Sequence, residues 1–229
     1  DIVIHAAALA DVGACVRNPE IEFKTNVAGT QNILESCQKN NIEKFVFVSS
    51  AAVYGLGNRS VFKETDPCFP VSNYALSKYW GEQQTRLYYE LYNLPTTSIR
   101  FFSVYGSPQI PKKGSHSWAV AIFGALAKKG KPITVFGDGN QIRDFTHVSD
   151  IAESVVLSTE KESTNGKFFN VGTGKPTKIN DIVEKIFQHV KPVPIKYKPY
   201  PPGDPIGGYS DTTLMKKLLD WEPQITLDQ

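Results

Sequence analysis

The order of apolar segments along this chain predicts an α/β fold in which helices cover a parallel sheet. Three short runs rich in β-branched and aromatic residues are predicted as strands, at 2–5, 44–49 and 96–102. Between them lie two longer segments with helical periodicity, 19–39 and 72–92. Because each is long enough to carry the chain back across a sheet, consecutive strands are expected to run parallel.

The two long helices carry their own start and stop signals. Apolar residues recur on one broad face of 19–39, and the pair Asn40 and Asn41 is expected to end that helix. Ser72 is the expected N-cap of the helix over 72–92, because its hydroxyl can accept a backbone N–H of the first turn.

After Gly106 the sequence changes character and predicts a smaller lobe. A polar segment containing Pro and Gly, 107–117, is expected to be a loop. The remaining elements are predicted as helices at 119–129, 148–157, 180–190 (with Asn180 as its cap) and 214–219, strands at 132–136 and 168–171, and a proline-rich extended loop at 193–205.

The composition excludes several classes of protein. Hydrophobic residues make up 41% and charged residues 21%, and the net charge of +2 is too small to indicate binding to nucleic acid or an anionic membrane. The sequence has no signal segment and no apolar run long enough for a membrane span. Cys15, Cys37 and Cys68 are odd in number and form no CxxC, so we expect reduced thiols in a cytoplasmic protein and no metal site.

Three residues suit the removal of a proton from an alcohol. Ser50 follows the strand 44–49, and the carboxyl ends of parallel strands line the ligand crevice of such sheets. Tyr74 and Lys78 are four residues apart near the start of the helix over 72–92, so they share one face. A lysine ammonium lowers the pKa of a nearby phenol. With a serine hydroxyl beside it, such a phenol is a general base for a secondary alcohol.

The spacing of Tyr74 and Lys78 is not specific by itself. Tyr-x-x-x-Lys arises by chance, and a solvated helix surface is the alternative interpretation. Two features of the context favour catalysis. The pair follows the Ser-Ser end of a strand by about two dozen residues, and it opens a helix within a parallel-sheet pattern.

Four sequence blocks occur in an informative order: FVFVSSAAVYG (45–55), NYALSKYWGEQ (73–83), RFFSVYG (100–106) and FGDGNQIRDFTHVSDIA (136–152). IHAAAL near the start and TNVAGTQN (25–32) fit the same pattern. Over nearly the whole chain, these blocks resemble the extended short-chain dehydrogenase/reductase family of nucleotide-sugar epimerases and dehydratases. The resemblance implies a Rossmann-like doubly wound parallel sheet, a smaller α/β substrate-binding lobe, and NAD as the cofactor.

The resemblance also implies a role for each matching residue. Tyr74 is the expected base, Lys78 its partner and a contact to the nicotinamide ribose, and Ser50 the hydroxyl that bridges base and substrate. Cofactor contacts are implied for Ala6, Ala7, Ala8, Leu9, Thr25, Asn26, Tyr74, Lys78 and Phe102. Substrate contacts are implied for Ser50, Ser103, Thr134, Val135, Phe136, Arg143 and Asp204.

Three of these residues have an ordinary structural alternative. Arg143 could form a surface salt bridge with its neighbour Asp144. Ser103 could be a small residue at a strand end, and Phe102 could belong to the core.

The glycine fingerprint of dinucleotide-binding folds, GxGxxG or GxxGxxG, does not occur in this sequence. Because that loop lies near the start of the family's fold, we interpret the chain as lacking its first βαβ unit. On this interpretation 1–106 is a partial cofactor domain and 107–229 is mainly the substrate lobe, with elements near 145–190 returning to the sheet. The choice of NAD over NADP therefore depends on the resemblance, and whether this chain alone binds cofactor stays open.

Ala51 and Ala52 indicate which reaction of the family to expect. Dehydratases and decarboxylases of the family carry an acidic residue just after the catalytic Ser or Thr, and alanine cannot transfer protons. We therefore expect a 4-epimerase that works through a transient 4-keto sugar. The length of the segment 106–130 resembles that of the family's UDP-glucose/galactose epimerases, so UDP-glucose and UDP-galactose are the expected substrates. A UDP-glucuronate 4-epimerase, which Ser103 favours, another dehydratase or decarboxylase of the family, and an inactive or merely sugar-nucleotide-binding fragment are the alternatives.

The resemblance implies a homodimer as well. Relatives associate through two helices that correspond to 18–39 and 72–92, which would form a four-helix contact. Leu87, Tyr88 and Leu91 could contribute to it, although packing within the chain would explain them equally well.

Overall fold

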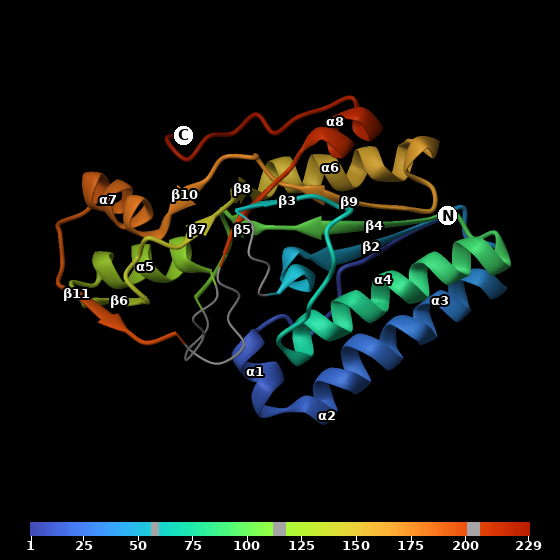
Figure 1. Ribbon diagram of the computed structural model, residues 1–229, viewed down its shortest axis with the longest axis horizontal. Helices are drawn as coiled ribbons and strands as arrows, with labels where there is room; N and C mark the ends of the chain where they lie inside the picture. Colours follow the sequence, from blue (N-terminus) through green and yellow to red (C-terminus); the bar gives the residue numbers. More distant parts are fainter. Residues whose placement is uncertain (56–59, 112–117, 201–206) are drawn as a thin grey trace.

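A four-stranded parallel sheet forms the centre of the molecule (Figure 1). The computed structural model describes residues 1–55, 60–111, 118–200 and 207–229. The strand order is β1-β2-β4-β9, formed by β1 (Ile2–His5), β2 (Lys44–Ser50), β4 (Thr96–Phe101) and β9 (Lys167–Val171), and all three pairings are parallel. The predicted parallel sheet is therefore confirmed, and its fourth strand comes from the second half of the chain.

Helices cover both faces of this sheet, as Figure 1 shows. They are α3 (Gly29–Lys39) and α4 (Asn73–Tyr92) on one face, and α6 (Val148–Glu160) and α8 (Thr213–Leu219) on the other. Strand β2 explains this arrangement, because alternate side chains of a strand point to opposite faces. Phe45 and Phe47 belong to the core cluster beneath α3 and α4, whereas Val46 belongs to the cluster beneath α6 and α8.

The predicted helix over 19–39 is continuous but not regular. It consists of α2 (Pro19–Glu22), a π-helical segment η1 (Phe23–Ala28) and α3. Hydrophobic periodicity does not distinguish a π-helical segment from α-helix, so the sequence did not reveal it. A short helix that the sequence analysis missed, α1 (Val12–Arg17), precedes it and begins at Asp11, whose carboxylate accepts the N–H of Ala14 at 2.7 Å.

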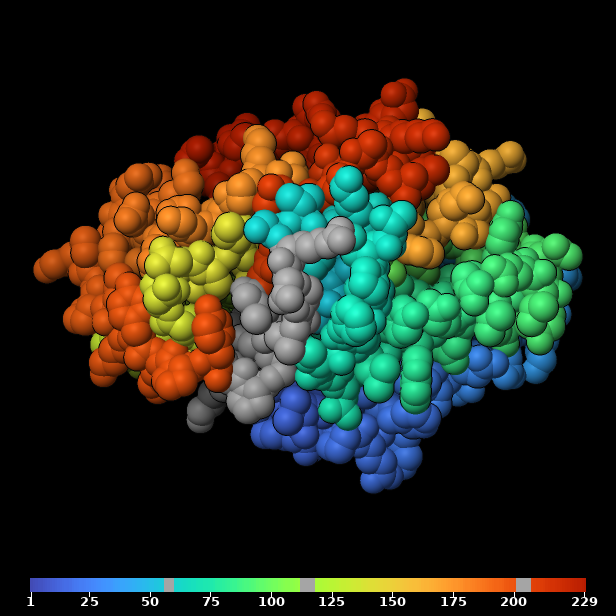
Figure 2. Space-filling view, viewed as in Figure 1, coloured from blue at the N-terminus to red at the C-terminus, as the bar shows by residue number. Residues whose placement is uncertain are grey.

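The second lobe has its own small parallel sheet and its own core. Strands β6 (Ile133–Phe136) and β11 (Ile195–Lys198) pair there, flanked by α5 (Ala119–Lys128) and α7 (Ile179–His189). Ile133, Val135, Phe123 and Ile182 are buried in this core. The space-filling view shows α7 and β11 at the left of the molecule and the α3–α4 layer at the lower right (Figure 2).

Two expectations about this lobe need correction. The segment 193–205, expected to be largely extended loop, contains an unpredicted strand, β11, which pairs with β6 despite the neighbouring prolines, and 201–205 lie outside the described residues. The N-cap of α7 is Lys178 and not Asn180, because the backbone N–H of Lys178 donates to Asp181. Asn180 lies within the first turn, and its amide donates to the carbonyl oxygen of Asp138 at 3.2 Å.

Short elements connect the two parts of the molecule. They are η2 (Ala51–Tyr54), β3 (Val61–Phe62), β5 (Ser103–Tyr105), β7 (Ile142–Arg143), β8 (Phe145–His147), η3 (Glu162–Thr164), β10 (Thr177–Lys178) and β12 (Tyr209–Ser210). Elements of two to four residues carry no measurable periodicity, which is why the sequence analysis did not predict them.

None of the helices in the described ranges is long and apolar enough to cross a membrane. All three cysteines are free thiols. Strand β1 pairs with β2 alone among the described strands, and its Ile2 and Ile4 side chains are exposed.

Candidate active site

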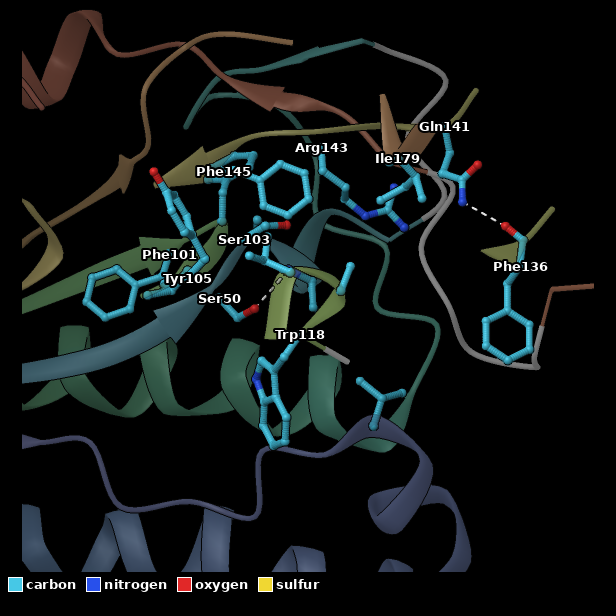
Figure 3. A pocket seen from close by; sticks show the side chains of 18 of the residues that line it. Ser50, Phe101, Ser103, Tyr105, Trp118, Phe136, Gln141, Arg143, Phe145 and Ile179 are labelled. Carbon is cyan, nitrogen blue, oxygen red and sulfur yellow. Dashed lines mark hydrogen bonds between the residues drawn. The ribbon is translucent and has the colours of Figure 1, made fainter. Parts of the chain in front are cut away.

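A cavity of about 650 Å³ lies between the carboxyl ends of β2 and β4 and the second lobe. The sheet side contributes Ser50, Tyr74, Phe102 and Ser103 to its lining, and the second lobe contributes Thr134, Phe136, Gln141 and Arg143. Figure 3 shows Ser50 and Trp118 in one part of the cavity and Arg143, Gln141 and Phe136 in another. A cavity of this size suits a ligand the size of a nucleotide sugar.

Ser50, Tyr74 and Lys78 come together, as the sequence predicted. Ser50 is the last residue of β2, and its side chain lies near enough to Tyr74 to lower the pKa of the phenol in part. Lys78 is buried below them, with its Nζ 5.9 Å from the centre of the Tyr74 ring. The same Nζ donates to the carbonyl oxygen of Val48 at 2.7 Å, which fixes the lysine against the end of β2.

The pKa values at this site are set first by burial. Burial raises the pKa of Tyr74, and the hydrogen bond with Ser50 lowers it in part. The expected lowering of the pKa of Tyr74 by Lys78 is therefore not seen. The Lys78 ammonium is itself desolvated and bound to a carbonyl, so burial lowers its own pKa to about 8, against the opposing effect of nearby Cys15, Glu22 and Glu82.

Asn26 attaches the loop after β1 to this site. Its Oδ1 accepts the N–H of Leu9 at 2.8 Å, and its Nδ2 donates to the Leu9 carbonyl at 3.1 Å and to Ser77 Oγ at 3.2 Å. Ser77 precedes Lys78, so one buried amide connects the loop to α4. The preceding residue Thr25 points outward and is exposed.

The loop that Asn26 holds presents small side chains at the carboxyl end of β1. Ala6 and Ala7 are exposed, and Ala8 and Leu9 are half-buried. Burial lowers the pKa of His5, the last residue of β1, and the nearby Lys78 lowers it further.

Phe102 and Ser103 lie where β4 ends and β5 begins. Phe102 lines the cavity and also packs on the cluster of Val53, Tyr54 and Phe62, so it contributes to the core as well as to the lining. The N–H of Ser103 donates to the Asp144 carbonyl at 2.8 Å, which fixes Ser103 in the wall of the cavity.

The far end of the cavity contains most of the predicted nucleotide contacts. Thr134, Phe136 and Arg143 line it, whereas the side chain of Val135 is fully buried in the core of the second lobe. Asp204 lies outside the residues that the structure describes. The salt bridge considered between Arg143 and its neighbour does not form, because the carboxylate of Asp144 is turned to other donors.

Several residues of the lining were not singled out from the sequence: Tyr105, Trp118, Gln141, Lys198 and Tyr200. Gln141 stands in the quoted block 136–152, and its Nε2 donates to the Phe136 carbonyl at 2.7 Å. Lys198 pairs in register with Phe136, which only a prediction of β11 would have revealed. Trp118 precedes α5 with a φ of 68°, and the sequence gives no signal for its position.

A buried ion pair supports the strand end that carries Ser50. Arg100 on β4 donates to Glu82 on α4 through two nitrogens, at 2.8 and 2.7 Å. Glu82 also accepts the hydroxyl of Ser49 at 2.5 Å, and Arg100 donates to the Tyr54 hydroxyl at 2.9 Å. This network joins β2, β4 and α4 next to the strand end that carries Ser50.

The sequence profile of the NAD dependent epimerase/dehydratase family matches residues 1–172. Among related proteins, a putative UDP-glucose 4-epimerase of Methanocaldococcus jannaschii is 37% identical over 232 residues, which cover 100% of this chain and 74% of that protein.

Solved structures are similar as well. UDP-glucose 4-epimerase of Thermotoga maritima with UDP-glucose aligns with a TM-score of 0.92 at 33% identity, over 99% of this chain and 73% of that one. UDP-glucuronic acid 4-epimerase of Bacillus cereus, in complex with UDP-glucuronic acid and NAD, aligns with a TM-score of 0.91 at 28% identity, over 100% of this chain and 72% of that one.

Proposed function

This chain belongs to the NAD-dependent epimerase/dehydratase family, and we propose that it inverts carbon 4 of the sugar in a UDP-sugar. The observation that carries the proposal is the grouping of Ser50 and Tyr74, with Lys78 beneath them, in a cavity whose other end holds Arg143. Ala51 and Ala52 line the same cavity beside Ser50 and offer no second group for proton transfer. This favours epimerisation over dehydration or decarboxylation.

The residues present fit the nicotinamide half of NAD. The small side chains of Ala6 and Ala7 leave the backbone open at the end of β1, and Asn26 holds the neighbouring Leu9 in place. We propose that this loop, with Tyr74, Lys78 and Phe102, holds that half of the cofactor, and that Thr25 contributes through its backbone. When bound, NAD supplies the acceptor and donor of hydride.

In the proposed reaction, Tyr74 removes the proton from the 4-hydroxyl of the sugar and later returns it to the other epimer. Ser50, which lines the cavity with Tyr74, donates its hydroxyl to the sugar oxygen and so holds that oxygen beside the phenol. Arg143, at the other end of the cavity, binds the diphosphate, with Thr134 and Phe136 beside the nucleoside. This leaves the sugar free to turn about its link to the diphosphate between the two proton transfers.

UDP-glucose and UDP-galactose are the substrates that we propose first. UDP-glucuronate is the second candidate, because Ser103 places a small hydroxyl residue in the cavity wall. Epimerisation assays with both UDP-sugars and added NAD separate the two. If the enzyme turns over neither UDP-glucose nor UDP-glucuronate, the proposed function is wrong.

Replacing Arg143 by Ala is expected to raise KM for the UDP-sugar about 10- to 100-fold, because a charge-assisted hydrogen bond contributes about 1.5–3 kcal/mol. Isothermal titration with UDP measures the same loss without turnover. Arg86→Ala is the matched control, because Arg86 is exposed on α4 and pairs with Glu90. An Arg143→Ala variant that binds UDP as tightly as the Arg86→Ala variant would remove the diphosphate contact from the proposal.

We also propose a homodimer formed through α3 and α4. Trp80, Leu87 and Leu91 are exposed on α4 at spacings of seven and four residues, which places them on one stripe, and Ile33 is exposed on α3. Sedimentation is expected to show a dimer for the parent chain and a monomer for Leu87→Arg. Val156→Arg, at an exposed apolar position of α6, is expected to leave the dimer intact. A monomeric parent chain would contradict the proposal.

We also propose a cytoplasmic location, which would suit a protein with three free thiols.

A further inference from the structure

Asp144 is a fully buried carboxylate that joins two neighbouring segments of the chain. From the first segment it accepts the N–H and the hydroxyl of Thr173, at 2.8 and 2.6 Å, and the N–H of Gly174 at 3.0 Å. From the second segment it accepts the N–H and the hydroxyl of Ser210, at 3.1 and 2.6 Å. All five donors are uncharged, so the carboxylate acts as a junction and not as one half of an ion pair.

Ser210 ends a four-residue segment, Gly207–Ser210, which we call the strap. Gly207 and Gly208 line the cavity. The strap runs close beside Arg143, because a Cβ on Gly207 would lie 2.2 Å from Arg143 Nη1 and 2.3 Å from the Ile142 carbonyl oxygen. Gly207 has a φ of +122°, so both its backbone conformation and this close approach require glycine.

The two edges of the strap are held by different parts of the fold. The N–H of Gly208 donates to the Ile142 carbonyl at 3.0 Å, which attaches the strap to β7. The N–H of Tyr209 donates to the Ser60 carbonyl at 2.9 Å, which attaches it beside β3. Asp144 holds its last residue and is directly preceded by Arg143, so one residue couples the position of the strap to that of the arginine.

We propose that Asp144 is a positioning residue that holds the strap against Arg143 and thereby sets the affinity of the cavity for a nucleoside diphosphate group. The inference rests on the proposed function, since it assigns the diphosphate to Arg143. Asp144 contacts neither Tyr74 nor Lys78 through any of its hydrogen bonds, so it acts on binding and not on proton transfer.

The two sides of Asp144 provide a matched pair of variants. Ser210→Ala removes the hydroxyl donor on the strap side, and Thr173→Val removes the hydroxyl donor on the other side, each of them 2.6 Å from the carboxylate. A purely structural junction would respond equally to both changes. The proposal expects Ser210→Ala to weaken UDP binding at least threefold in isothermal titration and Thr173→Val to weaken it less than twofold.

Asp144→Asn is the stronger test. The side-chain amide of asparagine can place an N–H donor against the donors of Ser210, so hydrogen bonds that hold the strap are lost. We expect KM for the UDP-sugar to rise at least tenfold while kcat changes less than threefold. Thermal unfolding shows whether Asp144→Asn folds. If it does not, the UDP affinities of Ser210→Ala and Thr173→Val decide whether the inference is right. Equal losses of UDP binding in that pair, or a fall in kcat with KM unchanged, would overturn the inference. A parent enzyme that binds no UDP would instead overturn the proposed function, and this inference with it.

Discussion

Replacing Tyr74 by Phe is expected to lower kcat about 10²- to 10⁴-fold, the range that a positioned general base contributes. The phenol lines the cavity together with Ser50, and Ala51 and Ala52 offer no other group that could accept a proton. The substitution removes one hydroxyl and leaves the ring, so the fold should be preserved. Epimerisation of UDP-glucose with saturating NAD measures the effect.

Tyr79→Phe is the matched control for this experiment. Tyr79 lies on the same helix but packs against the cluster of Val53, Tyr54 and Phe62. It should therefore keep near-normal kcat after losing its hydroxyl. Retained activity in Tyr74→Phe, or equal losses in the two variants, would show that Tyr74 is not the base.

The second large effect concerns stability. Glu82→Gln is expected to lower the free energy of unfolding by about 3–5 kcal/mol, because it leaves the charge of Arg100 buried without its partner. The side chains of Arg100 and Glu82 are 2% and 1% exposed, so water cannot replace the lost carboxylate. Urea unfolding measures the change.

Two further variants test whether the loss of stability in Glu82→Gln comes from the unpaired buried charge of Arg100. Glu90→Gln breaks the exposed pair with Arg86 on the same helix, and should cost no more than about 0.5 kcal/mol. The double substitution Glu82→Leu with Arg100→Met removes both charges, and should cost less than Glu82→Gln alone. A Glu82→Gln variant as stable as Glu90→Gln would contradict this account of the network.

The sequence predicted the central sheet well, because runs rich in β-branched and aromatic residues alternate with long helical segments. Strand β2 has Phe45, Val46 and Phe47 in succession, buried on both faces, which is the pattern of a parallel strand between helices. The long helix α4 was equally clear, and Ser72 caps it as predicted. The second lobe was harder because strand β11, Ile195–Lys198, is short and lies among prolines.

One part of the candidate site could be predicted, because it depends only on the order of strands and helices and on spacing within one helix. Ser50 follows a strand, and Tyr74 and Lys78 are one helical turn apart, so their meeting follows from topology. The pKa of Tyr74 was not predictable in this way, because it depends on how deeply the surrounding elements bury the phenol. The roles of Lys198 and Asp144 depend on long-range pairing, which residue patterns alone do not indicate.

The small side chains of Ala51 and Ala52, which line the cavity with Tyr74, bear on how the proposed enzyme treats its two sugars. Two epimers at carbon 4 differ in the side of the ring from which one hydroxyl projects. The methyl groups of Ala51 and Ala52 make no hydrogen bond that would favour either orientation. Neither sugar should therefore gain affinity from these two positions, and the direction of net flux is set by the concentrations of the two sugars relative to their equilibrium ratio.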